Sequence, residues 1–127
     1  MGRPVHFEIH AADPDRAQAF YVGLFGWTAQ HIGGPLDYRV LITGEAGEPG
    51  IDGAVLQRQG GEPEEGQAVN AFVCTISVDS IEATERAVVE AGGQQVSERM
   101  EVPNVGDLSY FKDTEGNFFG ALQPVSG

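Results

Sequence analysis

The feature that most limits how this chain can fold is a strand near its start, with the sequence HFEIH. Its residues alternate in character: Phe7 and Ile9 belong to one face, and His6, Glu8 and His10 to the other. A period of two residues is typical of a half-buried strand. The strand therefore presents three ionisable side chains on a single face, and we expect its apolar face to pack against a helix.

That helix is predicted directly after the strand, over about residues 14–25. Asp13 and Pro14 suit the N-cap and the first helical position, and Gly26 suits the end. Between them, apolar residues recur at spacings of three and four, which gives the helix one apolar stripe. The start of the chain is thus a strand, a turn and a helix.

The second half repeats this plan at a shift of 67 residues, from His6 to Val73 (73 − 6 = 67). Residues 72–78 alternate like a strand, and Asp79 or Ser80 can cap a helix over residues 80–91. Further strands are predicted in both halves, at residues 29–34, 38–43, 54–57, 95–96, 108–112 and 118–123. The pattern predicts one α+β domain, residues 1–127, made of two tandem βαβββ modules at 1–60 and 68–127.

Composition excludes several classes of partner. The 19 acidic residues against 7 basic ones give a formal charge of −12, which repels nucleic acid and anionic membranes. The acidity either steers a cationic ligand inward or only keeps the protein in solution. No apolar run is long enough to cross a bilayer and no secretion signal is recognisable, so we expect a cytoplasmic protein. Cys74, the only cysteine, lies in an apolar run and is expected to be a small core residue.

Two motifs carry a family resemblance. D-x-x-R-A-x-x-F-Y-x-x-x-F-G-W spans residues 13–27, and F-K-D-T-E-G-N-x-F spans residues 111–119. In this combination, and in a tandem βαβββ chain, they resemble the vicinal oxygen chelate superfamily of glyoxalases, bleomycin-resistance proteins and extradiol dioxygenases. The resemblance implies a cupped, mixed eight-stranded sheet with helices outside and the cavity inside, and it implies a homodimer.

The resemblance also implies where a metal would bind in the metal-dependent members. Of the four ligand positions of the family, the first falls on His6, a suitable ligand. The others fall near Ala54, on Val73 and on Gly120, none of which offers a donor atom. We therefore expect no metal at the family position and no cofactor. A separate site made by His6, Glu8 and His10 is the alternative, because these side chains share one strand face.

Two classes of function remain open from the sequence. The first is a metal-independent binder of a small, mainly apolar molecule, and the second is a lyase- or dioxygenase-type enzyme that uses His6 and Glu8 as acid and base, with or without a divalent metal. The residues expected to contact the ligand lie on the predicted cavity face or its rim. They are His6, Glu8, His10, Tyr38, Thr75, Tyr110 and Phe118.

Overall fold

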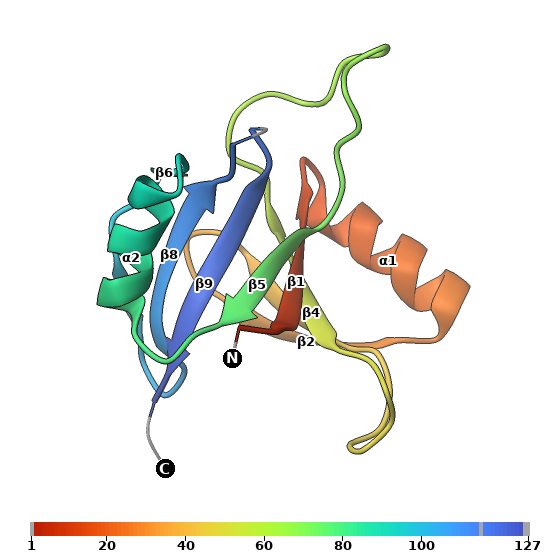
Figure 1. The fold of residues 1–127 in the computed structure, drawn as a ribbon. Coiled ribbons are helices and arrows are strands. Elements are labelled where there is room, and N and C mark those ends of the chain that lie inside the picture. The colour runs from red at the N-terminus through yellow and green to blue at the C-terminus, as the bar shows by residue number, and fades with distance from the viewer. Residues whose placement is uncertain (1, 115, 126–127) are drawn as a thin grey trace. The chain divides into compact units, whose positions relative to one another are not determined.

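The computed structural model describes residues 2–114 and 116–125, which form two compact units. The first unit is His6–Phe72. The second unit joins residues 2–5 to residues 73–125. Each unit is described by itself below, with the element labels of Figure 1.

The first unit has a four-stranded sheet and one helix. Its strands lie in the order β2-β3-β4-β1, with β1 parallel to β4 and the other pairs antiparallel. Its elements are β1 (Pro4–Ala11, of which the first two residues belong to the second unit), α1 (Pro14–Phe25), β2 (Thr28–Gly33), β3 (Tyr38–Ile42) and β4 (Asp52–Gln57). This is the βαβββ order predicted from the sequence.

Helix α1 begins and ends as its sequence predicts. The Asp13 side chain accepts a hydrogen bond from the backbone N–H of Arg16 at 3.1 Å, which satisfies one of the free amides of the first turn. Gly26 ends the helix in the left-handed conformation, with φ of 74°. The helix packs on the apolar face of β1, where Phe7 and Ile9 are buried, so the predicted facing of this strand is confirmed.

The second unit repeats the plan with one interruption. Strand β5 runs parallel to β9, and β9 lies beside β8 and antiparallel to it (Figure 1). The short strands β6 and β7 both pair with β8. Its elements are β5 (Val73–Ser77), α2 (Ile81–Glu90), β6 (Gln94–Gln95), β7 (Met100–Val102), β8 (Gly106–Lys112) and β9 (Phe118–Pro124). The described residues therefore contain nine strands, because the edge strand of this unit is divided into β6 and β7.

A serine explains the division of that edge strand. The backbone N–H of Tyr110 donates to the Ser97 hydroxyl at 2.9 Å, so a side chain replaces the backbone carbonyl that a continuous strand would offer. The core of the unit lies on the α2 side of the sheet, where Ile81, Phe111 and Ala121 are buried. Strand β7 was not predicted from the sequence.

Two details differ from the sequence prediction. Cys74 is exposed, so the prediction of a small core cysteine is wrong. The strand begins at Val73 and not at Phe72, whose ring stacks on that of Phe7 in the first unit with a centroid distance of 5.2 Å. The sequence also predicts a tight turn at residues 113–117; this range includes residue 115, which lies outside the described residues. No helix in the described part of the chain is both long and apolar enough to span a membrane.

Candidate functional site

A polar cluster lies in the first unit, on the face of β1 opposite α1. Nε2 of His6 is 2.8 Å from the hydroxyl oxygen of Tyr38, and the two rings are stacked with an interplanar angle of 15°. Tyr38 opens β3, where the alternation of the strand buries Arg39 and Leu41 on the helix side. The tyrosine is therefore turned to the same face as His6.

Glu8 stands next to this pair. Its side chain is buried, with a relative exposure of 4% for the residue, and its Oε1 is 3.7 Å from Nε2 of His10. Burial of a carboxylate costs free energy unless hydrogen bonds or charges compensate it. The structure thus brings four of the sequence-predicted residues to one strand face and its neighbour: His6, Glu8, His10 and Tyr38.

Burial and charge decide the protonation of the two hydrogen-bonded rings. Burial lowers the pKa of His6 below its ordinary value of 6.5, and the negative charges of Glu8 and Asp52 oppose this shift. Burial, and after it the charge of Glu8, raises the pKa of Tyr38. At neutral pH the cluster therefore holds a neutral imidazole and a protonated phenol close to a carboxyl group.

Asp52 is a further acidic neighbour of His6. The parallel register of β1 and β4 places Asp52 directly opposite His6 and Ala54 opposite Glu8. The Asp52 carboxylate accepts hydrogen bonds from the backbone N–H and the hydroxyl of Thr43, at 2.8 and 3.3 Å, so it also fixes the end of β3. The register of a parallel pair would have revealed this contact, but no local pattern in the sequence specifies it.

The remaining predicted residues lie in the second unit. Thr75 and Tyr110 are both opposite Gly120, on the two strands that flank β9. A Cβ atom added at Gly120 would lie 3.2 Å from Cε1 of Tyr110 and 3.3 Å from Oγ1 of Thr75, so these side chains already fill the space above the glycine. Phe118 is half exposed, and the Lys112 ammonium lies 5.4 Å from its ring centroid. Thr75 and Tyr110 are thus brought together. Phe118 lies apart from them, as the first residue of β9.

A family model of the glyoxalase-like domain matches residues 6–122. The chain belongs to this family. The match covers both units and both sequence motifs, which confirms the resemblance to the vicinal oxygen chelate superfamily.

Curated relatives of this glyoxalase-like domain come from bacteria and a fungus. The Mycobacterium tuberculosis protein named "Putative glyoxylase CFP32" is 31% identical over 120 residues, which are 93% of this chain and 42% of the relative. A "Glyoxylase-like domain-containing protein" of Didymella fabae is 34% identical over 113 residues, covering 87% of this chain and 84% of the relative. The chain therefore spans less than half the length of the mycobacterial relative.

Solved structures share the fold at low sequence identity. A hypothetical protein, BH1468, from Bacillus halodurans aligns with a TM-score of 0.70 at 17% identity, over 99% of this chain and 96% of that one. Methylmalonyl-CoA epimerase from Mycobacterium tuberculosis aligns with a TM-score of 0.65 at 16% identity, over 97% and 88% of the two chains. At such identities the likeness establishes the fold alone.

The glyoxalase-like domain does not offer a metal the donors that the family resemblance implies. Nε2 of His6 is already within hydrogen-bond distance of the Tyr38 hydroxyl, and the side chain at the position near Ala54 carries no donor atom for a metal. In the second unit Val73 has an apolar side chain, and the space that a carboxylate would need at Gly120 is taken by Tyr110 and Thr75. Within the described residues, no three His, Cys, Asp or Glu side chains are grouped so as to hold an ion. These residues do not fit a divalent metal.

Proposed function

We propose that this glyoxalase-like domain binds a small, mainly apolar molecule on the face of the first-unit sheet opposite α1. The polar end of the ligand is held by His6, Glu8 and Tyr38. The observation that carries the proposal is Glu8, a carboxyl group placed with two hydrogen-bonded rings on a face that the helix does not cover. Polar groups that converge in this way fix the orientation of a ligand whose apolar area supplies the affinity.

Metal independence is part of the proposal. It is supported by the donor set, because only His6 among the four family positions has a metal-binding side chain. A single imidazole that is already hydrogen-bonded to Tyr38 is too weak a site for a divalent ion. Orientation of the ligand is therefore assigned to hydrogen bonds and to the carboxyl group.

The second candidate function is an enzyme of the lyase or isomerase type. The observation that favours it is the lowered pKa of His6, which keeps the imidazole neutral and able to accept a proton at pH 7, close to Glu8. In this scheme the ring nitrogen of His6 that does not face Tyr38 takes a proton from an acidic C–H or O–H of the substrate, and Glu8 stabilises the imidazolium. The same residues thus serve either function, and a chemical readout must distinguish them.

A thermal-shift screen of hydrophobic metabolites and basic antibiotics tests binding at this face. Ligands that stabilise the wild type should stabilise Glu8→Gln and His6→Ala less, by about 1–3 kcal/mol of binding free energy where the carboxylate is paired with the ligand. Arg86→Gln, an exposed substitution on α2, is the control and should leave the shifts unchanged. Stabilisation that is equal in wild type and both variants would remove this face as the binding site.

Incubation of the same ligands in deuterated water separates the two candidate functions. An enzyme that transfers protons would exchange a carbon-bound hydrogen of the ligand for deuterium, and the exchange would vanish in His6→Ala. A binding protein would leave the proton NMR signals of the ligand's carbon-bound hydrogens at full intensity. Wild-type exchange that survives in both His6→Ala and Glu8→Gln would contradict the assigned roles.

A homodimer is the proposed assembly. Exposed apolar side chains support it: Leu24 and Phe25 of α1 are each more than half exposed. Sedimentation velocity at micromolar concentration should give a species of twice the chain mass of 13.5 kDa. A monomer throughout the micromolar range would contradict this part of the proposal.

A further inference from the structure

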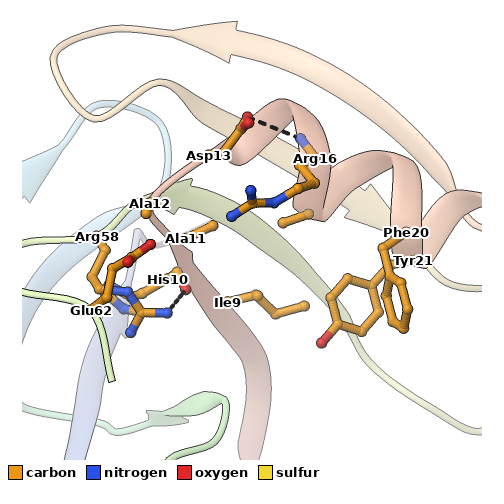
Figure 2. Close-up of a pocket in the computed structure, with 11 residues that line it drawn as sticks. Ile9, His10, Ala11, Ala12, Asp13, Arg16, Phe20, Tyr21, Arg58 and Glu62 are labelled. Atoms are coloured by element: carbon orange, nitrogen blue, oxygen red, sulfur yellow. Dashed lines mark hydrogen bonds between the residues drawn. The ribbon is translucent and has the colours of Figure 1, made fainter. Parts of the chain in front are cut away.

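A cavity in the first unit shares only one residue, His10, with the polar cluster. It is formed by the end of β1, the first two turns of α1 and the residues that follow β4, and its volume is about 380 Å³ (Figure 2). Neither His6, Glu8 nor Tyr38 lines it. Its volume lies within the range of about 300–1,000 Å³ that is typical of small-molecule sites.

One wall of the cavity is apolar and partly aromatic. Ile9 and Ala17 lie beside Phe20 and Tyr21, whose rings meet edge to face with a centroid distance of 5.1 Å and an angle of 84°. Phe20 is 59% exposed, so a large ring stands in solvent at this wall. A flat apolar ligand would cover this ring and remove apolar surface from water.

The opposite part of the cavity carries two arginines, although the whole chain has only 7 basic residues. The guanidinium of Arg16 has no hydrogen bond or ion pair within the described residues. Arg58 is anchored to the end of β1, because its Nη2 donates to the His10 carbonyl at 2.7 Å, as Figure 2 shows. Its Nε is buried without a hydrogen-bond partner among the described residues, so the anchor leaves this guanidinium incompletely satisfied.

Two acidic residues also face the cavity, and they decide which ligand charge fits. Asp13 is the N-cap of α1, and its Oδ1 accepts the backbone N–H of Arg16. Glu62 is exposed and lies in the segment rich in glycine, proline and glutamate that follows β4. One acid is thus engaged by the helix and the other can turn to solvent, whereas Arg58 is held in place. The lining thus holds two acids and two arginines; among the described residues, the arginine group left without a partner at a fixed place is Nε of Arg58, which can only donate to an acceptor.

We propose that this cavity binds a small carboxylate with a flat apolar body. The carboxylate accepts hydrogen bonds from Arg16 and Arg58, whose planar guanidinium groups match its geometry. The apolar body lies against Ile9, Phe20 and Tyr21. Of the polar cluster only His10 lines this site, so the proposal stands whether or not His6, Glu8 and Tyr38 hold a ligand.

Calorimetric titration with 2-naphthoate tests the proposal, together with 2-naphthamide and 2-naphthylmethylamine as neutral and cationic probes of the same shape. Naphthoate should bind one per chain, and the amide should bind at least about 10-fold more weakly, because it loses the charge-assisted hydrogen bonds. Amide signals of residues 9–21 and 58–62 should shift in the NMR spectrum when naphthoate is added.

Single substitutions then assign the charges. Arg16→Gln should weaken naphthoate binding about 10-fold while preserving the melting temperature, because its guanidinium holds no other part of the chain. Glu62→Gln should strengthen naphthoate binding, since it removes the opposing charge. Arg86→Gln on α2 is the matched arginine control and His6→Ala the control for the other face, and both should bind naphthoate like the wild type.

Any of four results would overturn the proposal. Equal affinity for naphthoate and naphthamide would show that the cavity binds the apolar body of the ligand and does not recognise the carboxylate. Tighter binding of the amine would show that Asp13 and Glu62 set its preference. Unchanged naphthoate binding in Arg16→Gln, or NMR shifts confined to residues outside the cavity, would place the carboxylate elsewhere.

Discussion

The hydroxyl oxygen of Tyr38 lies 2.8 Å from Nε2 of His6, although 32 positions separate the two residues in the chain. The contact exists because β3 and β1 flank β4, and because each strand turns these residues away from α1. The contact joins the His6 imidazole, whose pKa is lowered by burial, to the Tyr38 phenol, whose pKa is raised by burial. The protonation of His6 is therefore an experimental measure of the whole cluster.

We expect the imidazole of His6 to titrate below 6.5 in the folded protein, because burial disfavours its charged form. The unfolded chain then binds more protons than the folded one between the folded pKa and 6.5, so acidification through this range lowers the free energy of unfolding. The loss is complete below the folded pKa. NMR titration of the His6 ring protons measures the pKa directly.

The matched variant is Glu8→Gln, which removes a negative charge that raises the pKa of His6. Its His6 pKa should be lower than that of the wild type. In His6→Gln the part of the pH dependence that comes from this ring should disappear from urea unfolding curves recorded from neutral pH down to below the folded pKa of His6. A wild-type His6 that titrates above 6.5 would show that the carboxylates outweigh burial.

Glu85 of α2 holds three neighbours in the second unit. Its carboxylate accepts hydrogen bonds from Gln95, the Arg99 guanidinium and the buried hydroxyl of Ser109, the last at 2.9 Å. Glu85→Ala leaves the Ser109 hydroxyl buried without this acceptor, and we expect a loss of about 1–3 kcal/mol in the free energy of unfolding.

Glu82 is the control on the same helix. Within the part of the chain that the structure describes, its ion pair is with Arg86, and both side chains are mostly exposed, so Glu82→Ala should change the free energy of unfolding by less than about 1 kcal/mol. Urea unfolding monitored by circular dichroism compares the two variants. Equal losses would show that the buried hydroxyl of Ser109 does not depend on Glu85.

Much of the fold can be predicted from the sequence, because helix caps and strand alternation are set by residues close together in the chain. Asp13 and Gly26 cap α1 where the sequence predicts, and the alternation of β1 is strong enough to assign its two faces. Strand β7 escapes such reasoning, because the break that separates it from β6 involves a long-range contact, the Ser97 hydroxyl that accepts from the Tyr110 amide. Cys74 escapes it as well, since an apolar run does not reveal which of its faces is covered.

The candidate sites likewise combine features that the local sequence predicts with features that depend on long-range contacts. His6 and Glu8 share a strand, so two-residue parity alone groups them. Tyr38 was expected near the cavity, but its pairing with His6 needs the strand order β3-β4-β1. The cavity between Arg16 and Arg58 needs the return of the chain after β4 to the end of β1, where the Arg58 amide donates to the Ala11 carbonyl at 2.9 Å. Long-range contacts of this kind leave no periodic signal in the sequence.

Gly120→Asp tests the conclusion that the family's metal-ligand position in the second unit does not bind a metal. Restoring the family carboxylate should not create a metal site, because Tyr110 and Thr75 occupy the space beside this backbone position. Crowding at 3.2–3.3 Å should instead lower the free energy of unfolding by about 1–3 kcal/mol. Calorimetric titration with zinc, nickel, manganese and iron should give no stoichiometric binding in the wild type or the variant. A tight isotherm in the wild type that is lost in His6→Ala would overturn the assignment.

Gly53 is the position where one added methyl group should do most damage to the first unit. It lies in β4 directly opposite Phe7, and a Cβ atom there would fall 2.5 Å from three carbon atoms of the phenylalanine ring. That ring has little room to move, because it is 6% exposed and packs against the rings of Trp27 and Phe72. Gly53→Ala should therefore lower the free energy of unfolding by about 1–3 kcal/mol or more.

Two further variants identify ring crowding as the cause. Gly61→Ala, where an added Cβ meets no atom within 4 Å, should leave the free energy of unfolding unchanged or raise it by up to about 1 kcal/mol. Phe7→Leu should cost less in the Gly53→Ala background than in the wild type, because the smaller side chain relieves the clash and the two changes share one contact. The His6 ring protons should shift in Gly53→Ala, since the displaced ring belongs to the neighbouring residue of the strand. Full additivity of the Phe7 and Gly53 substitutions would instead show that backbone strain, and not the ring, opposes the methyl group.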